Sequence, residues 1–289
     1  MTDDIFFHIK RLPLGANRFS TIRQNNKIYV DKTSLIYEFA ILDTPIFFSR
    51  PRRFGKTLLL NTLSCLFANG IEDFRGLDIE KKWQDKTYQV VRLDFSGLAN
   101  TPADFFIESL DDVLIIQFKM QGIVSKFDEL KIRRPNIILK EICEKIDNYS
   151  TVLLIDEYDA PLLHHIDNPD ELQNIMNVLN DFYAIVKEYT YKFRLIFITG
   201  VTRTSHISIF SAFNNLKDIS LDERFNSLLG FTQNDLEQYF DEYIDVSAKI
   251  LNMKKEDLYQ RLKQYYDGFQ FAINAKETIY NPWSILSFF

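Results

Sequence analysis

Nine residues in the first quarter of the chain, Ser49 to Thr57, end in a glycine, a lysine and a threonine. The segment reads Ser-Arg-Pro-Arg-Arg-Phe-Gly-Lys-Thr, and its last three residues match the second half of the phosphate-binding pattern G-x-x-x-x-G-K-[ST]. In that chemistry Lys56 pairs with the β- and γ-phosphates of a nucleotide, and the Thr57 hydroxyl binds Mg²⁺. An apolar run precedes the segment and another follows it, which predicts a strand, a loop and a helix whose free N–H groups favour an anion. We call residues 49–57 the phosphate loop.

The first half of the phosphate loop departs from the pattern, because Arg50 stands where the pattern has glycine. Glycine there allows a backbone turn with positive φ, which an arginine resists. One hypothesis is that the loop takes another path and that its guanidinium groups contact the phosphates directly. The alternative is that an arginine pairs with a carboxylate such as Asp31 or Asp159 and is structural. The predicted nucleotide-binding residues are Arg50, Arg52, Arg53, Phe54, Gly55, Lys56 and Thr57.

A second candidate segment begins about 100 residues further on, where four apolar residues, Val152–Ile155, are followed by Asp156 and Glu157. Such a run is typical of a strand buried on both faces of a parallel sheet, and ligands bind at the carboxyl ends of such strands. We therefore predict that Asp156 binds Mg²⁺ together with Thr57, and that Glu157 polarises the attacking water. The alternative is that the two acidic residues only end a core strand.

Polar residues also follow the apolar run at 193–198, beginning with Thr199. In NTPases with an extra strand between the phosphate loop and the acidic strand, a polar residue at this point senses the γ-phosphate, and Thr199 or Thr202 would serve here. The alternative is that these threonines only end the strand. The predicted catalytic residues are Lys56, Glu157 and Thr199. Asp94, which ends another predicted strand, would support Asp156 or serve only as a cap.

The pattern of apolar runs and helix signals predicts an α/β fold, a P-loop NTPase with a mostly parallel sheet of about five strands flanked by helices. A short additional strand is expected at 27–30. The predicted core strands are 45–49, 89–95, 151–155, 193–198 and 218–221, and the main helices are 34–41, 56–68, 102–120, 136–147 and one opening at Asn168-Pro169.

The composition narrows the class of protein. The chain has 289 residues, of which 46% are hydrophobic, enough for one substantial domain and a smaller one. The net charge of −6 does not favour overall attraction to nucleic acid or to an acidic membrane. The two cysteines lack metal-ligand spacing, and the acidic start does not resemble a signal peptide. We expect a cytoplasmic protein without a membrane-spanning segment.

Taken together, the motifs resemble the bacterial and archaeal AAA-ATPase-like proteins, which commonly carry a C-terminal nuclease-like domain of the PD-(D/E)XK type. The resemblance implies an ATP-binding core at 1–228, a helical lid at 229–289, and ATP and Mg²⁺ as ligands. In that family the arginine-rich form of the loop looks normal. The segments that carry the resemblance are 29–33, 49–57, 154–159, 199–202, 213–216, 230–232, 266–269 and 280–282.

Family members usually continue into the nuclease-like domain, whereas this sequence stops within the apolar segment Trp283–Phe289. We expect a chain truncated before that domain, with docking of the segment on the lid as the alternative. Three functional hypotheses follow: an ATPase that couples hydrolysis to a conformational change, a nucleotide-binding switch or scaffold without turnover, and the regulatory half of a nucleic-acid-processing nuclease system. The partners are accordingly ATP, a protein partner or a second copy, and nucleic acid through the missing domain.

Overall fold

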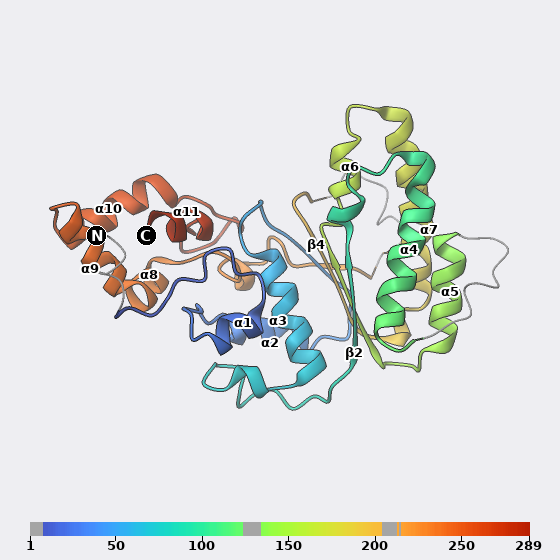
Figure 1. Cartoon of the computed structure of the whole chain (residues 1–289), viewed down its shortest axis with the longest axis horizontal. Helices are drawn as coiled ribbons and strands as arrows, with labels where there is room; N and C mark the ends of the chain where they lie inside the picture. The colour runs from blue at the N-terminus through green and yellow to red at the C-terminus, as the bar shows by residue number, and fades with distance from the viewer. Residues whose placement is uncertain (1–7, 124–133, 204–212, 214) are drawn as a thin grey trace.

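A five-stranded parallel sheet forms the centre of the molecule (Figure 1). The computed structural model describes residues 8–123, 134–203, 213 and 215–289. Within them the strand order is β2-β3-β4-β1-β5, and every neighbouring pair is parallel. The predicted α/β fold with a parallel sheet of five strands is confirmed. The strands are β1 (Ile46–Ser49), β2 (Gln89–Asp94), β3 (Thr151–Asp156), β4 (Phe193–Gly200) and β5 (Lys217–Asp218).

Helices cover both faces of the sheet, as the crossovers between parallel strands require (Figure 1). One face packs on the long helices α4, α5 and α7 and the short α6, and the other face packs on α1, α2 and α3. These helices are α1 (Phe19–Gln24), α2 (Thr33–Ala40), α3 (Lys56–Asn69), α4 (Ala103–Met120), α5 (Pro135–Lys145), α6 (Ala160–His164) and α7 (Pro169–Glu188). Short 3-10 turns connect them at Glu72–Phe74, Phe95–Leu98, Thr190–Lys192 and Glu223–Phe225.

The strand order explains why distant motifs meet. All residues of β1, β3 and β4 are buried, as expected for central strands with two covered faces. Strand β4 lies between β1 and β3, and the three strands are parallel. Their carboxyl ends therefore lie side by side at the same end of the sheet. The phosphate loop follows β1, Asp156 ends β3, and Thr199 lies near the end of β4. The predicted extra strand between the loop and the acidic strand is thus present.

A separate group of C-terminal helices lies beyond α1–α3, away from α4, α5 and α7 (Figure 1). They enclose a small hydrophobic core that also takes in Ile9, Leu12, Ile28 and Val30 from the N-terminal segment. The predicted strand at 27–30 is wrong, because Ile28 and Val30 pack with the C-terminal helices, Tyr29 packs on Phe19, and the segment joins no strand of the sheet. The C-terminal helices are α8 (Gln233–Tyr239), α9 (Asp241–Ile250), α10 (Lys255–Tyr266) and α11 (Pro282–Phe288).

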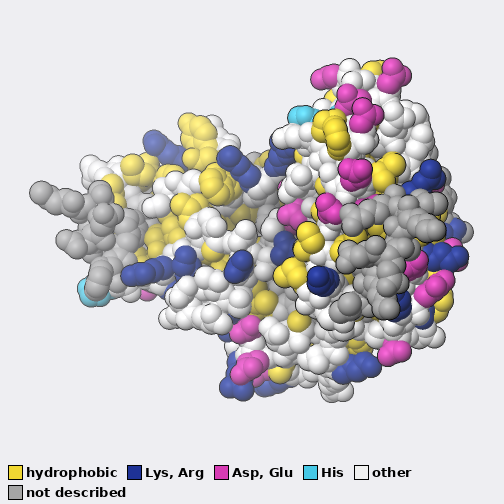
Figure 2. All heavy atoms as spheres, turned by 45° about the vertical axis from the view of Figure 1, so that its right-hand side comes forward, with side chains coloured by type: hydrophobic (Ala, Val, Ile, Leu, Met, Phe, Trp, Pro, Cys, Tyr) yellow, Lys and Arg dark blue, Asp and Glu magenta, His cyan; other side chains and the backbone are white. Residues whose placement is uncertain are grey.

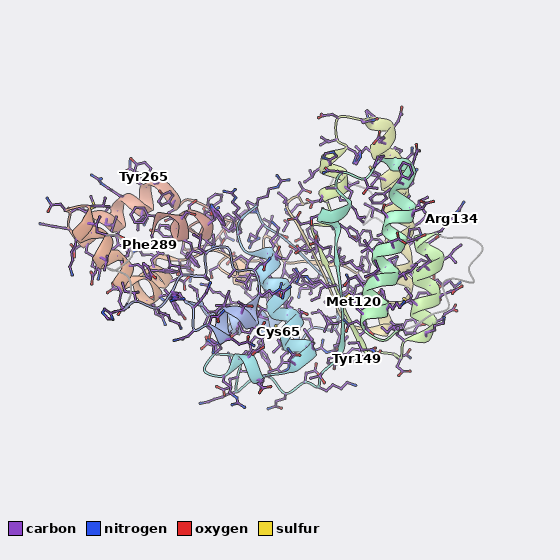
Figure 3. All side chains as sticks on the ribbon, viewed as in Figure 1. Cys65, Met120, Arg134, Tyr149, Tyr265 and Phe289 are labelled. Carbon is purple, nitrogen blue, oxygen red and sulfur yellow. The ribbon has the colours of Figure 1, made fainter. Side chains whose placement is uncertain are left out.

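The apolar end of the sequence packs within these helices (Figure 3). The Phe289 ring stacks on Phe240 with 5.8 Å between centroids, and its centroid lies 5.3 Å from that of Tyr243. The hydrophobic terminal segment is therefore part of the core of the C-terminal helices. Within the residues described, no helix has both the length and the hydropathy needed to cross a membrane.

Candidate active site

The phosphate loop ends in a glycine that starts helix α3. Gly55 adopts φ 95°, a conformation that glycine reaches without steric cost, and no side chain at this position caps the first turn of α3. The other left-handed residue of the loop is Arg53, with φ 68°, and not Arg50. The positive φ that the pattern assigns to a glycine at position 50 therefore occurs three residues later, at Arg53. The first-turn N–H groups of α3 remain in place for an anion.

Arg50 is a structural residue in this arrangement. Its side chain is 2% exposed, and its guanidinium donates to the carbonyl oxygens of Ser49, Ser220 and Phe225 at 2.7–2.8 Å. It also lies over the ring of Phe271, 4.0 Å from the centroid. Burial lowers the pKa of this guanidinium to about 9. The expected contact with phosphate does not fit this position, and the partners that replace it are carbonyl groups and rings rather than the carboxylates considered from the sequence.

Lys56 points into the phosphate loop. Its ammonium donates to the carbonyl oxygens of Arg50 at 2.9 Å and Pro51 at 3.1 Å, and the side chain is buried. Burial lowers the pKa of Lys56, and the carboxylate of Glu157 is the largest opposing influence. The lysine is therefore held at the concave side of the loop, where a phosphate group would give it a stronger partner than carbonyl oxygens do.

Asp156 and Thr57 approach each other across the gap between β3 and α3. Burial raises the pKa of the Asp156 carboxyl, and a hydrogen bond from the Thr57 hydroxyl is the main opposing effect. A guanidinium nitrogen of Arg92 on β2 lies 3.5 Å from a carboxylate oxygen of Asp156. Asp94 on β2 is paired with Asp156 in the β2–β3 register. The Asp94 side chain accepts a hydrogen bond from the N–H of Ser96, so it also acts as the cap that was the alternative for this residue.

Glu157 occupies a strained backbone position at the end of β3. Its φ of 49° is unusual for a residue with a side chain, and such strain is often found at functional sites. Burial raises the pKa of its carboxyl, the nearby Asp156 raises it further, and Lys56 opposes both. The side chain is only half-buried and lines a cavity beside the phosphate loop. A carboxyl group with a raised pKa in a cavity suits the role of a general base.

The two threonines at the end of β4 do not face this cavity. The Thr199 hydroxyl is fully buried and donates to the carbonyl oxygen of Phe48 at 2.6 Å. The Thr202 hydroxyl donates to the Asp159 carboxylate at 2.6 Å. Both hydroxyls therefore hold neighbouring segments together, which favours the alternative that they end the strand and does not support a catalytic role for Thr199.

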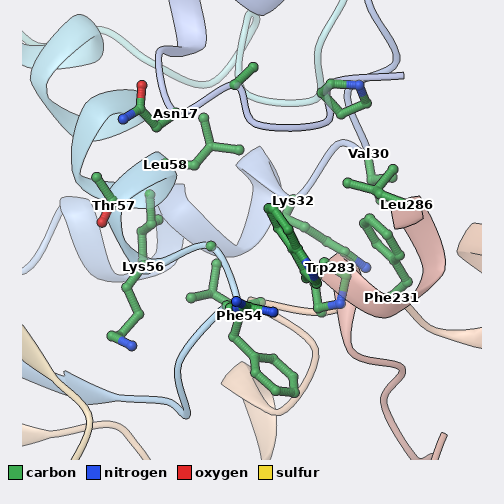
Figure 4. A pocket seen from close by; sticks show the side chains of 18 of the residues that line it. Asn17, Val30, Lys32, Phe54, Lys56, Thr57, Leu58, Phe231, Trp283 and Leu286 are labelled. Atoms are coloured by element: carbon green, nitrogen blue, oxygen red, sulfur yellow. The ribbon is translucent and has the colours of Figure 1, made fainter. Parts of the chain in front are cut away.

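A cavity of about 470 Å³ opens between the phosphate loop, the N-terminal segment and the C-terminal helices. Figure 4 shows Lys56 and Thr57 on one side of it and Phe231, Trp283 and Leu286 on the other. Such a volume is in the range of small-molecule sites, and mixed polar and apolar walls are usual for them. Asp156 lies behind the wall, while Glu157 contributes to it.

The remaining loop residues divide between the cavity and the C-terminal helices. Arg52 and Arg53 are exposed and line the cavity. Phe54 is 1% exposed, and its ring packs edge-on against Phe269 and Phe271, with centroids 4.8 and 5.3 Å away. The Phe54 side chain thus anchors the loop to the segment that connects α10 and α11. Because the ring is buried in this packing, little of it is exposed to a ligand.

Comparison with known proteins agrees with this geometry. A sequence model of the family described as "Predicted AAA-ATPase" matches residues 13–210, a span that contains the phosphate loop and strands β1 to β4. The chain belongs to this family. The family description, a predicted ATPase, agrees with the phosphate loop at the start of α3.

An uncharacterized protein encoded in the vnfD 5' region of Azotobacter chroococcum mcd 1 is 31% identical to this AAA-ATPase-like chain over 282 residues. The match covers 97% of this chain and 52% of the relative, so the chain spans about half of the relative's length. Among solved structures, the Walker-type ATPase PABY2304 of Pyrococcus abyssi matches with a TM-score of 0.39 and 11% identity, over 91% of this chain and 67% of that one.

Asp159 of this AAA-ATPase-like site has other partners than the loop arginine considered from the sequence. Asp159 is fully buried, and its carboxylate accepts hydrogen bonds from the N–H groups of Val201 and Thr202. Gly200 allows the close approach, because a Cβ there would lie 2.5 Å from a carboxylate oxygen of Asp159. The family motifs at 154–159 and 199–202 are therefore two sides of one contact. The presence of both motifs in the sequence was the available indication that Asp159 contacts the segment after β4.

The family motif at 29–33 connects the core to the C-terminal helices. The Asp31 carboxylate accepts hydrogen bonds from the N–H groups of Thr33 and Asp78. The Lys32 ammonium pairs with Asp235 at 2.5 Å, and Lys32 also lines the cavity. This motif therefore positions a cavity wall.

The family motifs at 230–232 and 280–282 are structural. Gly230 has φ 95°, and a Cβ there would lie 2.1 Å from a methyl group of Ile279. Thr232 forms a capping box at the start of α8, and the Asn281 side chain caps α11. These residues set the path of the chain through the C-terminal helices.

Proposed function

We propose that this protein binds ATP with Mg²⁺ at the phosphate loop, hydrolyses it, and couples hydrolysis to movement of the C-terminal helices. In this proposal residues 1–228 are the ATPase core and residues 229–289 are a lid. The observation that carries the proposal is the convergence of Lys56, Thr57 and Glu157 on one cavity of about 470 Å³. A loop with a lysine, at the start of a helix and beside a strand that ends in two carboxylates, is suited to triphosphate chemistry.

The phosphates would lie against the first turn of α3. The N–H groups of Gly55, Lys56 and Thr57 and the positive end of the helix dipole stabilise negative charge there. The Lys56 ammonium would exchange its two carbonyl acceptors for phosphate oxygens, and its desolvated position strengthens that interaction. Arg52 and Arg53 line the same cavity and provide exposed guanidiniums for the γ-phosphate.

Thr57 and Asp156 are suited to a magnesium site. A hydroxyl and a carboxylate are hard oxygen ligands, and the proximity of the Thr57 hydroxyl lowers the pKa of the Asp156 carboxyl, which supports their binding one ion together. No group of three or more His, Cys, Asp or Glu side chains with metal-site geometry occurs in the described part of the chain. That fits Mg²⁺, which usually takes one or two protein ligands together with phosphates and water. The ion would neutralise charge that develops on the phosphates.

Glu157 is the proposed general base. It lines the cavity, whereas Asp156 is 1% exposed and faces Thr57. A carboxylate in this place accepts the proton of the attacking water and orients the water toward the γ-phosphate. Its raised pKa strengthens the base as long as the group is deprotonated near neutral pH.

The base and ribose would occupy the apolar part of the cavity. Its wall includes Ile28 and Val30 from the N-terminal segment and Phe231, Trp283 and Leu286 from the C-terminal helices. Aromatic and aliphatic groups of this kind bury a flat ring system favourably. Since these walls come from both the core and the lid, a bound nucleotide would contact both parts.

The direct test is ATP hydrolysis by the purified chain in a single-turnover experiment, with and without Mg²⁺. We expect phosphate release that requires Mg²⁺ and is lost in Lys56→Ala. Parallel reactions with DNA or RNA test for stimulation by nucleic acid. ATP binding with no phosphate release under any of these conditions would contradict hydrolysis and support a nucleotide-binding switch, an alternative that the buried hydroxyl of Thr199 favours.

A regulatory role in a nucleic-acid-processing nuclease system is the other alternative. It is motivated by the resemblance to proteins that commonly carry a C-terminal nuclease-like domain. On the face shown in Figure 2, both acidic and basic side chains are exposed. Stimulation of hydrolysis by DNA or RNA, with a nuclease-like domain encoded alongside this chain, would support that role.

A further inference from the structure

A cation–π contact joins the charged edge of the phosphate loop to helix α11. The Arg53 guanidinium lies over the ring of Trp283, 4.8 Å from its centroid. Arg53 belongs to the loop, and Trp283 lies in the first turn of α11. Both side chains line the cavity, and both are exposed, Trp283 by 40%. The contact therefore lies at the surface of the proposed nucleotide site.

The cavity wall shows why such a contact matters. Its basic residues in the described structure are Lys32, Arg52, Arg53 and Lys56, all from the core. Residues 228–286 contribute only apolar side chains and a glycine to this wall. The C-terminal helices therefore have no cation of their own in the wall with which to bind a phosphate. Any response of these helices to the number of phosphates has to pass through a core residue.

Two contacts of the loop with the C-terminal part of the chain respond differently to charge in the cavity. Phe54 is buried between Phe269 and Phe271, and apolar packing of this kind does not change when charge enters the cavity. Arg53 is exposed, and a guanidinium interacts more strongly with phosphate than with the face of an exposed indole. A triphosphate would therefore withdraw Arg53 from Trp283 and leave Phe54 in place.

We propose that Trp283 senses the γ-phosphate indirectly, because Arg53 exchanges the indole for the γ-phosphate when ATP is bound, and α11 then shifts while Phe54 stays packed on Phe269 and Phe271. This inference rests on the proposed function, since it requires ATP in the phosphate loop. It adds a route by which hydrolysis reaches the C-terminal helices. After hydrolysis and phosphate release, Arg53 returns to the Trp283 ring.

The test uses the two tryptophans of the chain, Trp83 and Trp283. The protein is labelled with 5-fluorotryptophan, and the two ¹⁹F NMR resonances are assigned with Trp283→Phe. Trp83 packs against Phe67 on the far side of α3 and serves as an internal control. Spectra are recorded without nucleotide, with Mg²⁺ and a non-hydrolysable ATP analogue, and with Mg²⁺ and ADP. Nucleotide binding is measured separately by calorimetry.

We expect the ATP analogue to move the Trp283 resonance and leave Trp83 in place, whereas ADP moves Trp283 by less than half as much. In Arg53→Ala the Trp283 resonance should already be displaced without nucleotide and should lose most of its response to the analogue. Arg52→Ala, which changes the adjacent exposed arginine, should keep the wild-type position without nucleotide.

Three outcomes would overturn the inference. A Trp283 resonance that does not move although calorimetry shows binding rules out the exchange and leaves the proposed function intact. An undiminished response in Arg53→Ala means that the nucleotide acts on Trp283 without this arginine. An absence of binding removes the proposed function together with the inference.

Discussion

The core side and the C-terminal side of the cavity are built in different ways. The core side carries charge: Lys56 and Glu157 lie at the ends of elements held by strands that are buried throughout. The C-terminal side is apolar and depends on a small separate core shared with the N-terminal segment. A rigid, charged half suits phosphate chemistry, and a half that packs independently suits movement.

The two halves also differ in how their residues are joined. On the core side, parallel pairing of β1, β3 and β4 sets the positions of the loop and the carboxylates within one sheet. On the other side, the contacts with the loop are made mainly by aromatic rings, such as Phe54 on Phe269, Arg50 over Phe271 and Arg53 over Trp283. We therefore expect substitutions in the core half to affect chemistry and those in the C-terminal half to affect affinity or coupling.

The largest expected effect is on the rate of hydrolysis. Glu157→Gln keeps the shape of the side chain and removes the proton acceptor, so the single-turnover rate should fall by about 10² or more while ATP binding is retained. Asp94→Asn is a matched control, because that carboxylate ends the neighbouring strand β2 and caps the turn at Ser96. Phosphate release at the wild-type rate in Glu157→Gln would assign the base to another carboxylate.

The next effect concerns binding of the phosphates. Lys56→Ala should weaken ATP binding by about 10², since a charge-assisted contact with phosphate is worth roughly 1.5–3 kcal/mol. The melting temperature should fall less than in Arg50→Ala, because removal of the ammonium loses two hydrogen bonds to carbonyl groups but also relieves the burial cost of its charge. Calorimetry with ATP and thermal unfolding separate the two quantities. Equal affinities in the variant and wild type would remove the phosphate-loop assignment.

Substitution of two arginines tests whether the loop contains one structural arginine, Arg50, and one phosphate-binding arginine, Arg53. Arg50→Ala should lower the free energy of unfolding by roughly 3 kcal/mol, because it leaves buried carbonyl oxygens of Ser220 and Phe225 without their donor. Its ratio of ATP to ADP affinity should stay at the wild-type value. Arg53→Ala should show the reverse pattern, with a lower ratio and little loss of stability. A reduced ratio in Arg50→Ala at unchanged stability would restore its predicted phosphate contact.

The pH dependence of hydrolysis should report the environment of Glu157. Burial raises the pKa of this carboxyl above its ordinary value of 4.5, and only the deprotonated form accepts a proton from water. Lowering the pH through the raised pKa therefore protonates the base, and the rate should fall tenfold per pH unit below it. A rate profile measured under single-turnover conditions should have its acidic limb above pH 4.5. A limb at or below that pH would contradict the assignment.

The smallest effect should come from the apolar wall. Leu286→Ala removes part of the surface that the base or ribose would contact, and a loss of about 1 kcal/mol corresponds to roughly fivefold weaker ATP binding. Inorganic tripolyphosphate has no base or ribose, so its affinity should be the same in the variant and wild type. A parallel loss of tripolyphosphate affinity would show that the two halves of the cavity are not separate in function.

Several parts of the fold and site followed from local sequence. The buried strands are apolar runs, and Gly55 with Lys56 and Thr57 marks the start of a helix, so the α/β fold and the phosphate loop could be predicted. Predictions about single polar side chains were less successful. Arg50 and Thr199 both occur where a phosphate contact was plausible, yet each donates to backbone carbonyl oxygens.

The sequence by itself determined the order of strands and loops and the chemical types at their ends, because apolar periodicity and turn residues act over a few neighbours. Only the tertiary structure decided which guanidinium and hydroxyl groups face the cavity. The partners of Arg50 lie up to 175 positions away along the chain, and Thr199 and its acceptor Phe48 are 151 positions apart. The direction of a buried polar side chain depends on which distant backbone groups need a hydrogen-bond partner, and those groups come together only when the sheet and the C-terminal helices pack.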